Sequence, residues 1–227
     1  MEDWSAIPFN NLEHIEVVST TVKRSMCHAC ERPQHYCMCD TIITPKLSLS
    51  TKVWILTHPC ELKNTSIKRT ARFLQMSLEN CSTLVSRNYS TCSDLLHSLE
   101  NEECILLFPS KNSIPLTDYA KNKIASNTVD SKSPLNLLVI DGTWRFAREI
   151  AYKNKELLSK AHHVSLNDLT GKFVVRRPPK EGYVSTLEAV VAALSILESI
   201  GPDIQEKLLA PMQLAIEQWK EHSEKNG

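Results

Sequence analysis

The sequence predicts an α/β protein in which a mostly parallel sheet is flanked by helices. Short apolar runs rich in Val, Ile and Leu alternate along the chain with segments of helical spacing. The clearest unit is 135–150, where an apolar run is followed by the turn dipeptide Asp141-Gly142 and then by a helical pattern. Asp141 is therefore expected at the carboxyl end of a strand, where open α/β sheets bind ligands. Capping of the following helix explains this aspartate equally well.

The composition is that of an ordinary soluble globular protein. The chain has 227 residues, of which 42% are hydrophobic and 23% charged, and its 26 basic residues balance 26 acidic ones. This balance argues against a protein that holds nucleic acid by its overall charge, but it leaves room for a local basic patch. The sequence has no apolar run long enough to span a bilayer and no signal-peptide pattern, so we expect a cytoplasmic or nuclear protein with no membrane partner.

Eight cysteines in such a compartment are more often thiols or metal ligands than disulfides. Four of them form two close pairs, which are Cys27 with Cys30 and Cys37 with Cys39. Four thiolates complete the tetrahedral shell of a structural zinc ion, whereas the alternative is four ordinary buried cysteines. We therefore predict an N-terminal arm over residues 1–25 and a zinc-binding segment over residues 26–45, with almost no apolar core of its own.

The first half of the chain contains three predicted strands. The run at 52–58 predicts a strand that Pro59 ends, and Asn64 or Thr65 would cap the helix that follows, which continues to about residue 78. A short strand at 82–87 and a short helix at 93–99 come next. A third strand at 104–110 ends in a proline turn, and a short helix is expected at 116–125 within an otherwise polar stretch.

The second half continues the alternation of strands and helices. The strand at 135–140 leads into a helix whose apolar stripe extends over 146–158, and 162–166 is a further strand candidate. Ser185 and Glu188 have the spacing of a capping box at the start of a helix that is apolar nearly all round to residue 197. An amphipathic helix at about 204–219 follows.

A basic segment precedes the capping box. Arg176, Arg177 and Lys180 lie in a stretch that has no acidic residue before Glu181, and two prolines keep its backbone extended. This segment is the best candidate in the chain for contact with an RNA backbone, and a solvated loop is the alternative. The five glycines are far apart, which argues against a glycine-rich dinucleotide finger or a P-loop.

Several motifs resemble those of one known family. Asp141-Gly142-Thr143-Trp144 is similar to the Asp-x-Thr-Trp signature of the DTW-domain family. The cysteine cluster, His58-Pro59-Cys60-Glu61, the strand end Phe108-Pro109 and the segment 185–189 also resemble family motifs and occur in family order. Members are tRNA-uridine aminocarboxypropyltransferases, which move the 3-amino-3-carboxypropyl group of S-adenosylmethionine to N3 of a tRNA uridine. The family's likeness to SPOUT methyltransferases implies a SPOUT-like catalytic domain over 50–222 with a C-terminal knot.

The resemblance also implies partners and site residues. S-adenosylmethionine would be the donor, tRNA the substrate and Zn²⁺ a structural ion, and no protein partner is implied. Asp141 would remove the N3 proton or hold the donor's ammonium, and Trp144 is expected to be a core anchor rather than a stacking surface. A SPOUT-type RNA methyltransferase and a non-catalytic, zinc-containing RNA-binding protein are the alternatives. The expected catalytic residues are Asp141, Thr143 and Trp144; the donor-binding residues are Phe108, Pro109, Ser110, Ile140, Asp141, Gly142, Ser185, Thr186 and Leu187; and the substrate-binding residues are His58, Glu61, Arg145, Arg176, Arg177 and Lys180.

Overall fold

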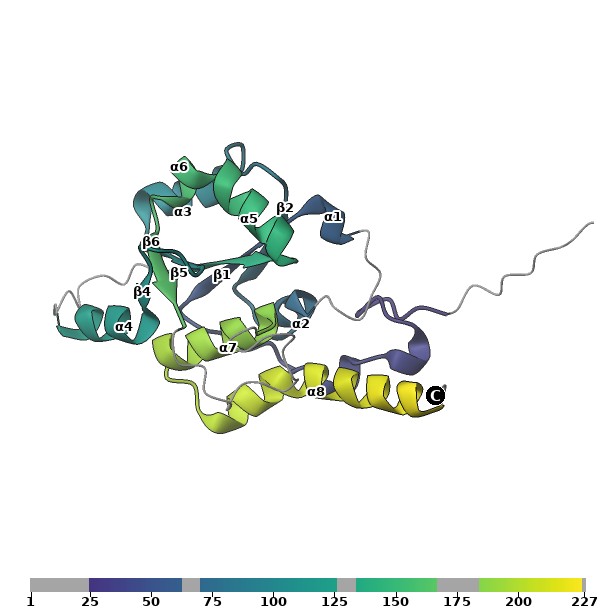
Figure 1. Ribbon diagram of the computed structural model, residues 1–227. Helices are drawn as coiled ribbons and strands as arrows, with labels where there is room; N and C mark the ends of the chain where they lie inside the picture. Colours follow the sequence, from purple (N-terminus) through teal and green to yellow (C-terminus); the bar gives the residue numbers. More distant parts are fainter. Residues whose placement is uncertain (1–24, 63–69, 126–133, 167–183, 226–227) are drawn as a thin grey trace, which may run out of the picture.

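The computed structural model describes residues 25–62, 70–125, 134–166 and 184–225. Within them, six strands form one sheet in the order β2-β1-β5-β3-β6-β4, and every neighbouring pair is parallel (Figure 1). The predicted parallel sheet is thus confirmed, and only the two-residue β4 was not expected. The strands are β1 (Lys52–Thr57), β2 (Cys81–Val85), β3 (Cys104–Leu107), β4 (Ile114–Pro115), β5 (Asn136–Asp141) and β6 (His162–Ser165).

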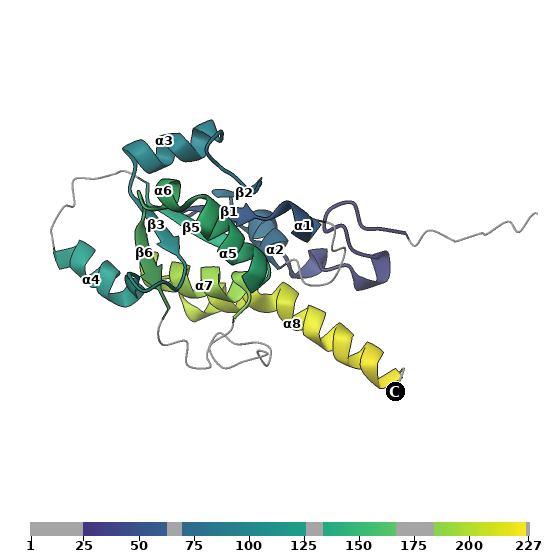
Figure 2. The same ribbon diagram turned by 45° about the horizontal axis from the view of Figure 1, so that its top comes forward.

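Helices cover both faces of the sheet (Figures 1 and 2). One face packs against α2 (Ala71–Ser77), α4 (Leu116–Ala125), α7 (Thr186–Leu197) and α8 (Pro202–Lys225). The other face packs against α3 (Ser93–Asn101), α5 (Trp144–Lys153) and α6 (Lys155–Leu158). A four-residue helix, α1 (Pro59–Leu62), directly follows β1.

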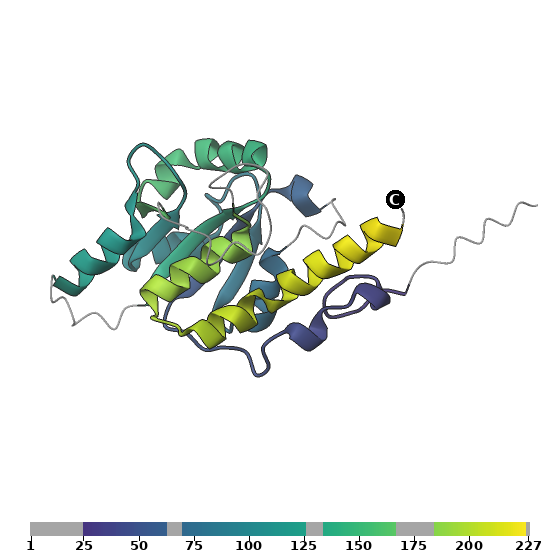
Figure 3. The same cartoon turned by 60° about the horizontal axis from the view of Figure 1, so that its bottom comes forward.

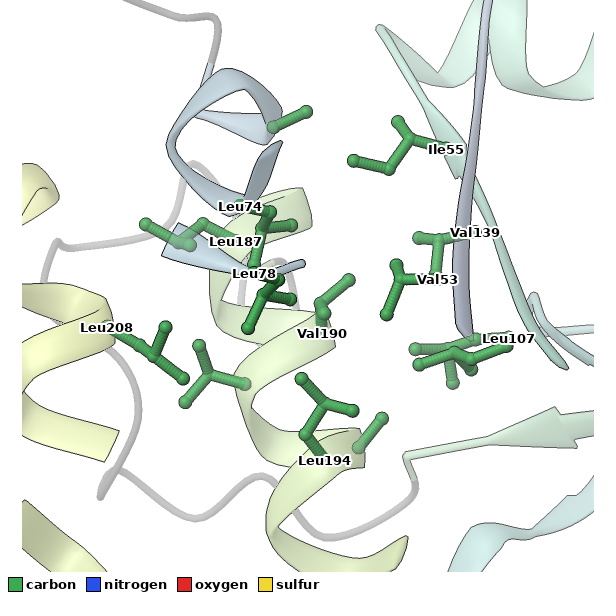
Figure 4. Packing of buried hydrophobic residues seen from close by; sticks show 14 of the residues in the cluster. Val53, Ile55, Leu74, Leu78, Leu107, Val139, Leu187, Val190, Leu194 and Leu208 are labelled. Carbon is green, nitrogen blue, oxygen red and sulfur yellow. The ribbon is translucent and has the colours of Figure 1, made fainter. Parts of the chain in front are cut away.

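The central strands are buried on both sides, as their continuous apolar composition predicts. Along β1, Val53 and Ile55 belong to the cluster under α7, whereas Trp54 and Leu56 belong to the cluster under α5. This division follows from the two-residue period of a strand, which sends successive side chains to opposite faces. Figure 4 shows strand residues of the first cluster facing the side chains of α7, with Leu74 and Leu208 beside them.

The helices differ from expectation mainly at their ends. The predicted helix over 146–158 is divided into α5 and α6 at Asn154, whose buried side chain donates to the carbonyls of Arg87 and Ile150. The last helix is longer than predicted and contains the buried Pro211 in its interior. The predicted helix start at Asn64 or Thr65 lies outside the described residues.

The cysteine-containing segment is attached to the same hydrophobic core. It contains the short 3-10 helices η1 (Gln34–Tyr36) and η2 (Cys39–Thr41) and lies alongside α8 (Figure 3). Met38 is fully buried in the cluster formed by the sheet, α7 and α8, and Ile42 and Ile43 pack against that cluster. Among the described helices, none combines the length and the apolar character that crossing a membrane requires. The predicted knot depends on residues 167–183, which lie outside the described residues, so it stays a prediction.

Burial of α7 should contribute strongly to stability. Leu194 is fully buried between α7 and the sheet, so replacing it with alanine removes apolar contacts and leaves a cavity. We expect Leu194→Ala to lower the free energy of unfolding by about 2–5 kcal/mol in denaturant titrations. Ile124→Ala is a matched control on α4, where the side chain is 78% exposed and the change should be below about 0.5 kcal/mol. Equal effects of the two substitutions would contradict this packing.

Candidate active site at the carboxyl ends of the strands

The carboxyl ends of β1, β5 and β3 lie side by side, because these neighbouring strands are all parallel. The chain leaves β1 and β3 toward the helices of one face, α2 and α4, but it leaves β5 toward α5 on the opposite face. Connections that diverge in this way open a crevice beyond the strand ends, which is where open α/β sheets bind ligands. Asp141, the last residue of β5, lies at this point.

A short hydrogen bond joins Asp141 to the start of α7. The hydroxyl Oγ1 of Thr186 donates to Asp141 Oδ1 at 2.6 Å, although the two residues are 45 positions apart. The predicted capping box fixes Thr186 in place, since Glu188 N donates to Ser185 Oγ and Ser185 N donates to Glu188 Oε2. The predicted donor-binding residues fall in three strand-end or helix-start loops, at 108–110, 140–142 and 185–187. The structure brings the second and third of these loops together. Of the predicted donor-binding residues in these two loops, Ile140 and Leu187 have buried side chains, so only their backbone can face a ligand.

The turn after Asp141 requires a glycine. Gly142 has φ +142°, a conformation that side-chain-bearing residues rarely adopt. A Cβ at this position would also lie 3.2 Å from Glu61 Cγ. Glu61 Oε1 in turn accepts a hydrogen bond from the backbone N–H of Thr143 at 2.9 Å. Thr143, rather than Asp141, is the N-cap residue of α5, and its carbonyl accepts from Ala147 N, so the capping explanation of Asp141 was wrong.

The third predicted loop reaches the same crevice through aromatic contact. The rings of Phe108, just after β3, and Trp144, the first residue of α5, have centroids 6.1 Å apart and planes inclined at 44°. Trp144 is 42% exposed, so the expectation that it is a core anchor was wrong. Burial of α5 is achieved by Ala147 and Ile150 instead, which leaves Trp144 at the rim. Pro109 and Ser110 are exposed, and Ser110 Oγ lies 3.4 Å from Nδ1 of His163 on β6.

His58 is fully buried behind the crevice, directly after β1. Its ring stacks on Phe146 of α5, with centroids 4.3 Å apart and planes within 9° of parallel. Nδ1 accepts a hydrogen bond from Cys60 N at 3.1 Å, so a neutral ring carries its proton on Nε2. This histidine was predicted to bind substrate; its side chain is buried, and it contacts the backbone of α1, which carries Glu61.

Glu149 was not identified from the sequence. Its Oε2 lies 3.5 Å from His58 Nε2, an electrostatic approach at the limit of hydrogen-bond length, and its Oε1 accepts from Lys153 at 2.8 Å. The bond from Lys153 is the main reason that the pKa of Glu149 is lowered, so this carboxylate remains ionised next to His58. The spacing of three residues places Phe146 and Glu149 on one side of α5, but only the structure shows that this side meets His58.

The predicted substrate-binding residues are divided by the structure. Glu61 and His58 lie at the crevice or directly behind it, and Arg145 is exposed in the first turn of α5. The basic residues Arg176, Arg177 and Lys180 lie outside the described residues.

The four predicted zinc ligands form one cluster. The sulfur atoms of Cys27, Cys30, Cys37 and Cys39 all lie within 4.8 Å of one another, and this group could hold a metal ion. Three of the sulfur pairs are separated by 3.5, 3.6 and 3.8 Å. Backbone N–H groups of Cys30 and Ala29 lower the pKa of Cys27 to about 6, which favours its thiolate, whereas burial raises the pKa of Cys39.

Arg72 holds the cysteine segment against the sheet domain. Its Nη1 pairs with Glu31 at 2.6 Å, and its Nη2 donates to the carbonyl of Ala29 at 2.7 Å. Because Arg72 belongs to α2, these contacts fix the loop between Cys27 and Cys37 relative to the main hydrophobic core.

Comparison with known proteins agrees with these motifs. The chain is 33% identical over 196 residues to tRNA-uridine aminocarboxypropyltransferase 2 of Drosophila melanogaster, which covers 84% of this chain and 73% of that protein. It is 31% identical over 226 residues to the protein of the same name in Macaca fascicularis, with coverage of 92% and 72%. Identity to tRNA-uridine aminocarboxypropyltransferase A of Arabidopsis thaliana is 28% over 211 residues, with coverage of 84% and 79%.

No solved structure gives a significant match to the chain. The DTW domain profile, in contrast, matches residues 24–220, which include the cysteine cluster, the sheet and α7. The chain therefore belongs to the DTW-domain family.

Proposed function

We propose that this protein is a tRNA-uridine aminocarboxypropyltransferase that uses S-adenosylmethionine as donor. Family membership and the names of its relatives in animals and a plant support this activity. The structural observation that carries the proposal is the hydrogen bond between Thr186 and Asp141, which joins two segments that resemble family motifs at one crevice. A carboxylate at the switch point of a parallel sheet is well placed to act on a bound cation.

The donor would bind to the three strand-end loops around Asp141. The backbone of 140–142 and 185–187 borders the crevice on one side, and the loop that begins at Phe108 borders it on the other. None of these loops is a glycine-rich finger, so backbone groups of bent loops would hold the donor's adenosine.

Transfer requires attack by uridine N3 on the γ-carbon of the donor's methionine moiety. The N3–carbon bond forms as the carbon–sulfur bond breaks, the sulfur keeps the bonding electron pair, and methylthioadenosine leaves. The positive sulfur is already a good leaving group, so the protein has mainly to orient the two reactants and accept the N3 proton. Asp141 could have one of two roles. It accepts that proton, or it binds the ammonium group of the donor.

The contact with Thr186 favours the second role, in which the N3 proton passes to water and not to Asp141. The hydroxyl that donates to Oδ1 is the partner expected of an ionised carboxylate, and such a group attracts an ammonium strongly in a partly buried site. An ammonium held near the end of β5 would fix the position of the aminocarboxypropyl group, which is the part of the donor that is transferred. The γ-carbon, rather than the methyl group, would then face the uridine.

The cysteine cluster would hold a structural Zn²⁺. Zinc–sulfur bonds of about 2.3 Å in a tetrahedron place the sulfurs about 3.8 Å apart, close to the separations in the cluster. The ion would stabilise the segment that packs on α2 and α8 through Arg72 and Met38. The role of the ion would be structural, and no step of the transfer depends on it.

Removal of the Asp141 charge should abolish transfer without unfolding the protein. Asp141→Asn keeps the shape and can still accept from Thr186, but it cannot attract an ammonium or accept a proton as a carboxylate does. With tRNA and donor, mass analysis of nucleosides should show product formation reduced by about a hundredfold or more. Asp118→Asn, at an exposed position on α4, is the matched control and should retain activity. Wild-type activity of Asp141→Asn would remove this carboxylate from the mechanism.

Substitution of Gly142 should disturb the turn that carries Asp141. Gly142→Ala adds a Cβ 3.2 Å from Glu61 and must adopt φ +142°, so we expect a loss of about 1–3 kcal/mol in stability together with reduced activity. Gly201→Ala is the control, because no atom lies within 4 Å of the Cβ that it would add. Thermal unfolding measures the loss of stability, and the nucleoside assay measures the loss of activity. Unchanged stability and activity of Gly142→Ala would show that the turn is not constrained.

Purified protein should contain about one zinc ion per chain by elemental analysis. Cys37→Ser should lower the zinc content and the unfolding temperature, because it removes one of four ligands. Cys92→Ser, a cysteine outside the cluster, should retain the metal. A metal-free preparation with unchanged stability would reject the site.

A further inference from the structure

One side of α5 combines arginine and aromatic side chains. Arg145, Arg148 and Tyr152 follow one another at spacings of three and four residues, which places them on the same side of the helix. All three are exposed, Tyr152 to 82%, and Trp144 at the first position of the helix is 42% exposed. We call these four residues the α5 ridge.

The ridge faces away from the sheet because the opposite side of α5 is its buried side. Ala147 and Ile150 pack into the cluster that α5 shares with the sheet. Figure 1 shows α5 in the outer layer above the strands. The ridge is therefore fixed on a packed helix, and it begins beside the crevice that contains Asp141.

The two arginines of the ridge are not neutralised by neighbours. Among the described residues, neither Arg145 nor Arg148 makes an ion pair, and Glu149 on the same helix is occupied by Lys153 and His58. Arg148 Nε donates to the carbonyl of Trp144 at 3.2 Å, which holds its guanidinium along the helix. Two arginines without an ion pair among the described residues thus lie between two exposed aromatic rings, and the guanidinium of Arg145 also lies 5.8 Å from the centroid of the Phe146 ring.

This combination fits nucleic acid better than another protein surface. Guanidinium groups pair with phosphates, and exposed aromatic rings offer stacking surfaces for unpaired bases. A chain with formal net charge +0 cannot attract RNA by its total charge, so it must use local patches. From Trp144 to Tyr152 the helix rises about 12 Å, between three and four base steps of about 3.4 Å.

We propose that the α5 ridge binds the RNA strand beside the target uridine. The inference rests on the proposed function for the identity of the RNA as tRNA. In it, Trp144 is nearest to the reacting base, Arg145 and Arg148 contact phosphates, and Tyr152 stacks on a base at the far end of the ridge.

Binding of unfractionated tRNA over a series of salt concentrations tests this proposal with the full-length protein. Arg148→Gln should weaken binding about fivefold and reduce the slope of log affinity against log salt by about 0.7–0.9, the loss of one phosphate contact. Tyr152→Ala should weaken binding about tenfold with an unchanged slope, because it removes stacking and no charge. Lys207→Gln, exposed on α8 at the other face of the sheet, is the charge-matched control and should change neither quantity.

The outcomes separate this inference from the proposed function. If both ridge variants bind tRNA as the wild type does, or if Lys207→Gln causes the same loss as Arg148→Gln, the ridge is not the RNA site. Wild-type tRNA binding by both ridge variants is also the result expected if α5 binds a protein instead. If the wild type binds tRNA through the ridge but transfers no aminocarboxypropyl group, the ridge is supported and the proposed activity fails.

Discussion

The hydrogen bond from Thr186 to Asp141 connects the end of β5 with the start of α7 at the centre of the candidate site. Each partner is fixed independently. Asp141 is the last residue of β5, one of the two central strands, and Thr186 is the first residue of a helix whose capping box is complete. Loss of either Asp141 or Thr186 would separate the motif at 141–144 from the segment 185–189. The geometry of the crevice thus depends on this one contact between distant parts of the chain.

A second set of contacts holds the crevice from the side of β1. Glu61 accepts from Thr143 N and packs against Gly142, while His58 stacks on Phe146 and approaches Glu149. The segment after β1 and the segment after β5 are therefore held together at two places. Since His58 and Phe146 are buried or partly buried, this arrangement stiffens the turn around Asp141 without contacting a ligand directly. Such support is needed where reacting groups must be held within a fraction of an ångström.

The fold was largely predictable because its strands are buried on both faces. Continuous apolar runs such as 135–140 mark strands, and the capping box at Ser185 marks a helix start, whatever the tertiary structure. The exposure of Trp144 was not predictable, since burial of α5 depends on which side of the helix meets the sheet. Nor was the contact of Glu149 with His58, because side chains 91 positions apart meet only through the packing of α5 on β1. The four cysteines, in contrast, are predictable because short spacing alone brings their sulfurs together.

Two preparations of the donor, each labelled in a different group, test most directly the claim that this crevice exposes the γ-carbon to uridine. One preparation of S-adenosylmethionine carries the label in its methyl group and another in its aminocarboxypropyl chain, and each is incubated with the protein and tRNA. The account predicts that label from the chain enters tRNA, while methyl label leaves in methylthioadenosine. Methyl label in tRNA, with S-adenosylhomocysteine as the other product, would contradict it.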